Sequence, residues 1–144
     1  MYAYDKIYLE KARTALGRML DYAVYDCGFE LEKFYKFFLQ SSLSKQFESG
    51  NPSVIAGKSG VEIAREVLWE QCGQTEYKKP RYTMNRSEEY WTGWVLAYYQ
   101  WYTARSFSEI EERISVEEVC AMYDLYHEMD IRQFADAVDA MEQK

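Results

Sequence analysis

The amino-acid sequence predicts an all-α protein, a single compact bundle of about six helices around a central aromatic helix. Two observations support this fold class. Apolar residues recur at steps of three and four along most of the chain, which is the period of a helix buried on one face. No segment shows the alternation of apolar and polar residues that is typical of a half-buried strand. We therefore expect one helical domain over residues 1–144.

Two helices are expected in the first part of the chain. Residues 4–26 carry an apolar stripe, and Gly28 follows as a residue that commonly ends a helix. Residues 30–40 place Phe34 and Phe38 on one face. The next segment is rich in Ser and Gly, and we expect a short helical turn at 43–47 followed by an ordered loop.

Further helix starts are predicted by capping boxes, in which two side chains three residues apart bond each other's backbone. The candidate pairs are Ser59 with Glu62, Ser115 with Glu118 and Asp130 with Gln133. The helix that begins at Ser59 is expected to end at Cys72, before Gly73. Ser108 or one of its neighbours is expected to begin a short helix before Ser115.

The segment 89–105, EYWTGWVLAYYQWYTAR, holds three of the four tryptophans and should form a helix capped by Ser87. A helical projection gathers one apolar face and leaves a second, more polar face opposite. The first consists of Trp91, Trp94, Val95, Tyr98, Trp101 and Tyr102, and the second of Thr92, Gly93, Leu96, Gln100 and Thr103. Because an exposed stripe of this size would promote aggregation, we expect this helix at the centre of the fold, with only its edges at the surface.

The size of the chain and its cysteines predict a cytoplasmic protein without a cofactor. A domain of 144 residues can bury about two-thirds of its surface and needs no disulfide or metal for stability. Cys27, Cys72 and Cys120 lie far apart, so we expect reduced, mostly buried thiols. The N-terminal segment lacks the apolar stretch of a secretion signal, and the longest uncharged run, 90–104, is too short to span a membrane.

Charge is distributed unevenly along this acidic chain of net charge −7. Residues 106–144 hold eleven acidic and three basic side chains, whereas residues 76–86 hold four basic and one acidic. The overall charge repels phosphate, which argues against direct binding of nucleic acid by the chain as a whole.

Two charged segments are the candidate partner-binding sites. The basic one has aromatic residues interleaved and suits an acidic protein surface or RNA, although a solvated loop would look the same. Its residues are Lys78, Lys79, Arg81, Tyr82 and Arg86. The acidic one could contact a basic partner or mimic nucleic acid, and consists of Glu109, Glu111, Glu112, Glu117 and Glu118. A weaker candidate is an anion site at a helix start, formed by Lys58, Ser59 and Gly60, where simple capping is the alternative.

The sequence carries no recognisable catalytic motif. AGKSG, residues 56–60, lacks the glycine spacing and the preceding strand of a phosphate-binding P-loop. The three cysteines and His127 could supply four zinc ligands, but no two of the cysteines have the spacing of a zinc knuckle. His127, the single histidine, has no assignable catalytic partner. We therefore expect neither enzymatic activity nor a bound metal.

Three stretches together resemble a known family: 19–68, 89–107 and 122–130. The family consists of small bacterial proteins encoded beside ADP-ribosyltransferase-like toxins and short proposed antitoxins. It has no established chemistry, so the resemblance implies a component of a toxin–antitoxin or defence module and no catalytic residue.

These observations favour a protein-binding module that neutralises or regulates a partner protein, such as a toxin or a defence enzyme. Two alternatives remain: an acidic inhibitor that mimics nucleic acid, and a nucleic-acid-binding regulator that uses the basic segment 78–86. Neither the docking surface nor the oligomeric state, a homodimer included, follows from the sequence.

Overall fold

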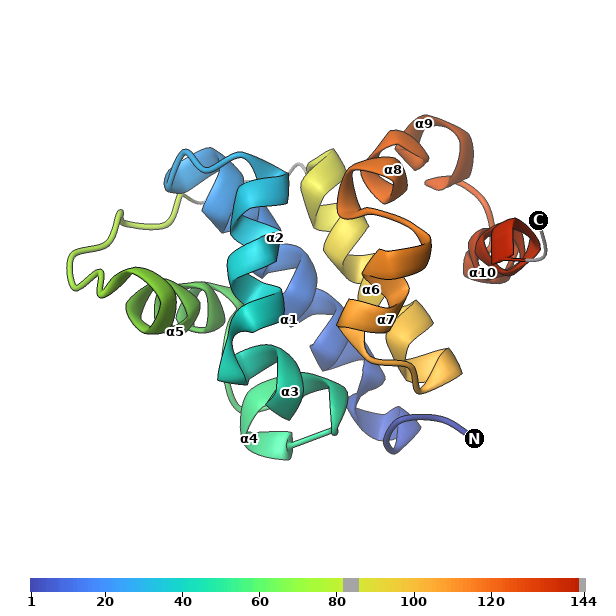
Figure 1. The fold of residues 1–144 in the computed structure, drawn as a ribbon, viewed down its shortest axis with the longest axis horizontal. Coiled ribbons are helices and arrows are strands. Elements are labelled where there is room, and N and C mark those ends of the chain that lie inside the picture. The colour runs from blue at the N-terminus through green and yellow to red at the C-terminus, as the bar shows by residue number, and fades with distance from the viewer. Residues whose placement is uncertain (82–85, 143–144) are drawn as a thin grey trace.

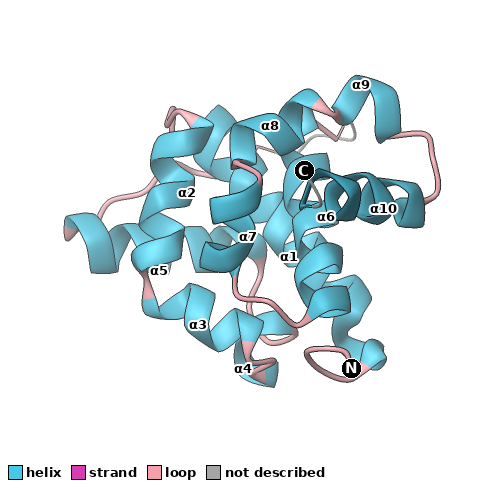
Figure 2. Cartoon of the chain, turned by 45° about the vertical axis from the view of Figure 1, so that its right-hand side comes forward, coloured by secondary structure: helices cyan, strands magenta, loops and turns pink. Residues whose placement is uncertain are grey.

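The computed structural model describes residues 1–81 and 86–142, and all regular structure in them is helical (Figure 2), which confirms the all-α prediction. These residues form ten α-helices rather than about six, so the predicted number was wrong. The helices are α1 (Leu9–Asp21), α2 (Leu31–Gln40), α3 (Ser42–Glu48), α4 (Pro52–Ile55), α5 (Gly60–Cys72), α6 (Glu88–Thr103), α7 (Phe107–Arg113), α8 (Val116–Ala121), α9 (Tyr123–Tyr126) and α10 (Ile131–Glu142). A 3-10 helix, η1 (Lys6–Tyr8), precedes α1, and a π-helical segment, η2 (Tyr22–Asp26), continues it.

Short helices that the sequence analysis missed account for the difference. The segment expected as a loop after α3 contains α4, because the Asn51 side chain accepts a hydrogen bond from Ser53 N and Pro52 occupies the first helical position. The helix expected after Ser115 is divided into α8 and α9 at Met122, whose N–H bonds to Val119 O three residues back.

The predicted helix starts and stops are largely confirmed. Ser59 with Glu62 and Ser115 with Glu118 form complete capping boxes, and Ser87 caps α6. The start left open near Ser108 lies at Ser106, which forms a further capping box with Glu109. At the C-terminal ends, Gly28 and Gly73 adopt the left-handed conformation, with φ of 76° and 65°.

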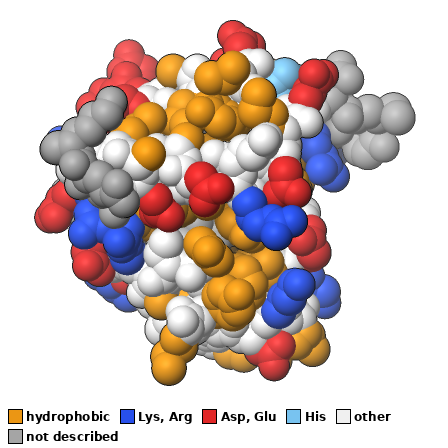
Figure 3. Space-filling model, turned by 90° about the vertical axis from the view of Figure 1, so that its right-hand side faces the viewer, with side chains coloured by type: hydrophobic (Ala, Val, Ile, Leu, Met, Phe, Trp, Pro, Cys, Tyr) orange, Lys and Arg blue, Asp and Glu red, His pale blue; other side chains and the backbone are white. Residues whose placement is uncertain are grey.

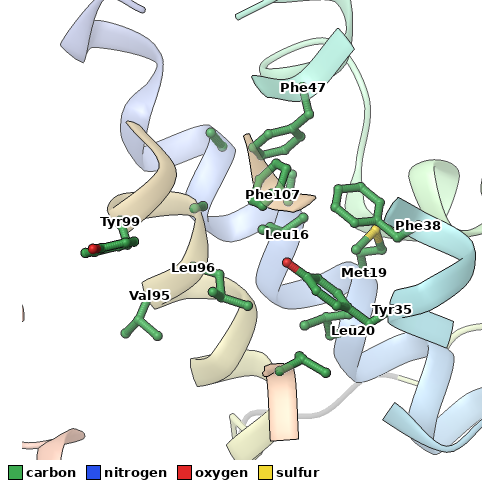
Figure 4. Packing of buried hydrophobic residues seen from close by; sticks show 14 of the residues in the cluster. Leu16, Met19, Leu20, Tyr35, Phe38, Phe47, Val95, Leu96, Tyr99 and Phe107 are labelled. Atoms are coloured by element: carbon green, nitrogen blue, oxygen red, sulfur yellow. The ribbon is translucent and has the colours of Figure 1, made fainter. Parts of the chain in front are cut away.

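Two helices, α1 and α6, form the centre of the molecule and pack against each other more extensively than any other pair of elements. Figure 4 shows Leu16 and Leu20 of α1 between Leu96 of α6 and Tyr35 of α2. The approach of α1 and α6 is close because Gly93 lies on the α1 backbone: a Cβ there would be 2.4 Å from Leu16 O. The predicted central position of the aromatic helix is therefore confirmed.

The two faces predicted for α6 were wrong in detail. Gly93, Leu96 and Gln100, assigned to the polar face, are buried, while Tyr102, assigned to the apolar face, is 41% exposed. Because neighbours cover α6 on nearly every side, Gly93 faces α1 and Gln100 is buried with hydrogen bonds to Glu48 O and Arg105 O, whereas Tyr102 reaches the surface. This helix is a buried core element, and its faces are set by the sizes of its neighbours rather than by polarity.

The C-terminal helix α10 lies at one side of the molecule, beside α6 and α9 (Figure 1). It is held there by the buried side chains of Phe134, Ala135 and Val138, and by a hydrogen bond of 2.6 Å from Tyr99 Oη to Asp139 Oδ1. In the residues that are described, no helix combines the length and the apolar character needed to cross a bilayer.

Candidate functional site

The basic segment is fastened to η2 by hydrogen bonds and an ion pair. Tyr22 Oη and Arg65 Nη2 donate to Lys78 O at 2.6 and 3.2 Å. The guanidinium of Arg81 pairs with Asp26, whose side chain is 1% exposed, and this carboxylate raises the pKa of Arg81. Residues 78–81 are therefore anchored on η2, and Arg65 of α5 adds a second point of attachment.

This anchoring separates the predicted basic residues into different environments. The side chains of Lys78 and Lys79 are exposed, whereas the charge of Arg81 is balanced by Asp26. Arg86 contacts α6, with its guanidinium 4.8 Å from the centre of the Tyr90 ring. Tyr82 falls outside the described residues. Of the predicted set, Lys78 and Lys79 remain together as exposed cations.

Two of the predicted acidic contacts serve as helix caps. Glu109 and Glu118 each accept a hydrogen bond from the backbone N–H of a Ser three residues earlier, at 3.0 and 2.9 Å. These bonds lower the pKa of both carboxyl groups. Their carboxylates remain exposed, but their positions are explained by local structure.

Two of the remaining acidic residues, Glu111 and Glu117, are affected by a side chain that the sequence analysis did not select, Glu32 of α2. A hydrogen bond and the negative charge of Glu32 raise the pKa of Glu117. Glu111, which accepts a hydrogen bond of 2.9 Å from Val116 N, is half-buried. Its burial, followed by the charges of Glu32, Glu117 and Glu118, raises its pKa to about 7. The exposed Glu112 belongs to the same helix, α7.

Glu111 makes the stability of the protein depend on pH. The pKa of Glu111 is about 7 in the folded protein, against an ordinary value of 4.5. The protonated carboxyl group therefore stabilises the fold fully below pH 4.5, and this stabilisation is lost as the pH rises through about 7. Gln at this position keeps an acceptor for Val116 N but does not ionise. Between pH 4.5 and 8 we therefore expect Glu111→Gln to become more stable than the natural chain, by about 1–2 kcal/mol after allowance for solvent screening.

Urea unfolding at a series of pH values tests this expectation. Glu109→Gln is the matched control, because its lowered pKa contributes stability that is present at neutral pH and lost in acid, the opposite sign. A stability difference for Glu111→Gln that does not change with pH would contradict the prediction.

The predicted anion site lies at the rim of a cavity of about 480 Å³ between α1 and the α4–α5 connection. The polar groups of this predicted site already have partners within the protein. Lys58 Nζ is 2.9 Å from Glu66 Oε2, and Ser59 and Glu62 cap each other. Gly60 is required for packing, since a Cβ there would lie 2.4 Å from Ala15 O. These contacts make the segment a tightly packed helix start.

The cysteines and the histidine do not converge. All three thiols are free. Cys72 is exposed, and Cys27 and Cys120 are only partly buried, so the expectation of mostly buried thiols was wrong. Cys72 follows the last buried turn of α5, where the helix leaves the core. Within 1–81 and 86–142, no three His, Cys, Asp or Glu side chains are grouped as metal ligands.

Two aromatic features emerge only in the folded chain. The first is an aromatic surface cluster of Tyr2, Tyr98, Trp101 and Tyr102, in which Tyr2 stacks on Trp101 at 4.1 Å. The second is a pocket of about 230 Å³ between the start of α6 and α9. The sequence signal was the aromatic content of segment 89–105, but the other contributing residues come from the N-terminus and from α9.

Comparison of the chain with protein-family models, with curated proteins and with solved structures finds no match in any of the three.

Proposed function

We propose that this protein is a non-enzymatic binding module that neutralises or regulates a partner protein, in the manner of an antitoxin. The observation that carries the proposal is the aromatic surface cluster. Tyr2 and Tyr102 are 54% and 41% exposed and their ring centres are 6.0 Å apart, so they form a contiguous exposed patch of the kind that marks interaction sites. Tyr and Trp are the residues most enriched where partner proteins contribute binding energy.

The cluster is held in place before any partner binds. Ala3 N donates to Trp101 O at 2.9 Å, and Trp101 Nε1 donates to Tyr4 O at 2.7 Å, which ties the N-terminal segment to α6. The rings of Tyr98 and Tyr102 stack with an interplanar angle of 13°. A rigid aromatic surface loses little side-chain entropy on association, which favours binding.

The surroundings of the cluster suit a protein interface. The charge of the exposed Arg132 acts on Tyr98, and the buried guanidinium of Arg13 lies 5.3 Å from the centre of the Tyr98 ring. Figure 3, which shows the side of the molecule where the N-terminus and α10 lie, displays areas of hydrophobic side chains bordered by charged ones. An apolar centre with a charged rim is the usual anatomy of a protein interface. The partner is expected to bring apolar side chains to the cluster.

Affinity purification from the native host, followed by mass spectrometry and binding of the purified partner, tests the proposal. We expect the natural chain to capture a protein and the double variant Tyr2→Ala/Tyr102→Ala to bind it at least about tenfold more weakly. Trp69→Ala is the control, because Trp69 is 62% exposed on α5 and lies outside the cluster.

Charged variants separate the cluster from the other candidate surfaces. Lys78→Glu/Lys79→Glu and Glu112→Lys should leave capture within a few-fold of the natural chain if the aromatic cluster is the main contact. Loss of binding in either of these variants, with full binding by the double tyrosine variant, would place the contact on a charged surface instead. Capture of no protein above a tagged control would argue against a partner-binding role.

A further inference from the structure

Four of the seven residues that line the pocket between α6 and α9 are Tyr or Trp. Its volume is about 230 Å³. The lining residues are Arg86, Ser87, Tyr90, Trp91, Trp94, Tyr123 and His127. Figure 1 shows α8 and α9 beside the first turns of α6, so the two sides of the pocket come from segments far apart in the sequence. None of the predicted partner-binding residues except Arg86 belongs to this pocket.

Each aromatic wall is held by a contact of its own. The Arg13 guanidinium covers one face of Trp94, 3.3 Å from the ring centre. The other face or the edge of the Trp94 ring therefore lines the pocket. Trp91 packs edge to face on Tyr123 at 5.7 Å, and Tyr123 stacks on His127 at 4.1 Å. A ligand would therefore meet walls that need little rearrangement, which lowers the cost of binding.

The polar groups of the pocket favour a negatively charged ligand. Arg86 supplies a permanent cation beside Tyr90, and its planar fork of donors matches the oxygens of a phosphate. His127 Nδ1 donates to Tyr123 O at 2.6 Å, so the neutral ring presents Nε2 as an acceptor for an N–H of the ligand, with Glu128 Oε1 3.8 Å from that nitrogen. Ser87 is already engaged, because its hydroxyl donates to Asp21 Oδ1 and accepts from Tyr90 N. A cationic ligand would be repelled by Arg86.

The shape and size of the pocket restrict the ligand further. Sites for drug-sized molecules usually have volumes of about 300–1,000 Å³, so this pocket accommodates one ring system rather than a whole large ligand. Aromatic walls favour a flat ring that can stack, as the bases of nucleic acids do on Tyr and Trp. We propose that this pocket binds a nucleobase carrying a phosphate, with the base among the aromatic side chains and the phosphate at Arg86.

Two sources could supply this chemistry, a free nucleoside monophosphate and the phosphorylated end of a single strand. The net charge of −7 disfavours a long polyanion along the surface but does not affect a single phosphate at Arg86. The proposal does not depend on partner binding, because the pocket and the aromatic surface cluster share no residue. Failure of one proposal leaves the other standing.

Isothermal titration calorimetry on the full chain tests the proposal. The probes are the four ribonucleoside monophosphates, the corresponding nucleosides, inorganic phosphate and a 5′-phosphorylated single-stranded tetranucleotide. We expect at least one monophosphate to bind with a dissociation constant on the order of 0.1–1 mM, and its nucleoside about tenfold more weakly. Inorganic phosphate should show no saturable binding. Tighter binding of the tetranucleotide than of the monophosphate would identify a strand end as the source, and equal or weaker binding would identify the free nucleotide.

Variants assign the two parts of the ligand to their residues. Arg86→Ala should weaken the monophosphate about tenfold and leave the nucleoside unchanged. Tyr123→Ala should weaken both ligands to a similar extent, and Tyr123→Phe, which keeps a stacking ring, should restore them. Trp69→Ala serves as the control for loss of an exposed aromatic side chain outside the pocket.

The exposed positions Arg86 and His127 keep the test decisive even if Tyr123→Ala fails to fold, as judged by circular dichroism. His127→Ala should weaken the monophosphate without altering the fold. Absence of saturable binding by every monophosphate below about 5 mM would overturn the proposal. Binding that is unchanged in both Arg86→Ala and His127→Ala would overturn it as well.

Discussion

Gly93→Ala is expected to lower the free energy of unfolding by about 3 kcal/mol, although alanine is the better helix former by about 1 kcal/mol. The reason is the contact between α1 and α6. A Cβ at position 93 would lie 2.4 Å from Leu16 O and 2.8 Å from Gly17 Cα, and both are backbone atoms that cannot rotate away. The two central helices would have to separate, which loosens the core that all other helices cover. Chemical denaturation followed by circular dichroism measures the change.

Gly73→Ala is the matched control for this prediction. Gly73 has φ of 65° and no atom within 4 Å of an added Cβ, so its replacement introduces backbone strain without a steric clash. We expect a loss of about 1 kcal/mol there. If Gly93→Ala were as stable as the natural chain, the close packing of α1 on α6 would be wrong.

Phe107→Ala is expected to cost about 3–5 kcal/mol. Phe107 begins α7, is fully buried, and contacts Phe38 and Phe47 edge to face, with ring centres 5.3 and 5.6 Å apart. Truncation removes the side chain through which α7 is joined to α2 and α3, and leaves a cavity among rings that cannot close around it. The free energy of unfolding from urea titration measures the loss.

Leu125→Ala provides the comparison on the same half of the chain, because Leu125 is 61% exposed on α9 and its truncation should change stability by less than about 0.5 kcal/mol. A loss below about 1 kcal/mol for Phe107→Ala would mean that α7 is not seated in the core as described.

The positions of the helix ends could be predicted because their signals are local. Ser59 with Glu62, and Ser115 with Glu118, interact across three residues, so the sequence contains both partners of each capping box. The same holds for Gly73, whose left-handed backbone ends α5 whatever surrounds it. The all-helical class follows from many such signals that agree with one another.

The surroundings of the charged candidate residues could not be predicted, since charge in a sequence does not reveal which charges meet. Arg81 was grouped with Lys78 and Lys79 by proximity in the chain, but in the fold it pairs with Asp26 on η2. Glu111 was grouped with its acidic neighbours on α7 and α8, but its pKa is raised chiefly by burial, and Glu32 of the distant α2 adds to the effect of those neighbours. Pairings of this kind depend on long-range packing, which a linear pattern of charge does not encode.

The aromatic helix α6 separates what the sequence determines from what only the tertiary structure decides. The content of segment 89–105 was sufficient to predict a helix at the centre of the fold, because so much aromatic surface has to be removed from water. Which of its sides would meet α1 depended on the shape of both helices, and Gly93 rather than any aromatic residue decided it. The aromatic surface cluster and the aromatic pocket were decided in the same way, since each combines α6 with a distant segment that only packing brings beside it. Local hydrogen bonding and hydrophobic period were enough to predict the class and most helix boundaries, and steric fit between distant segments determined the surfaces to which function is proposed here.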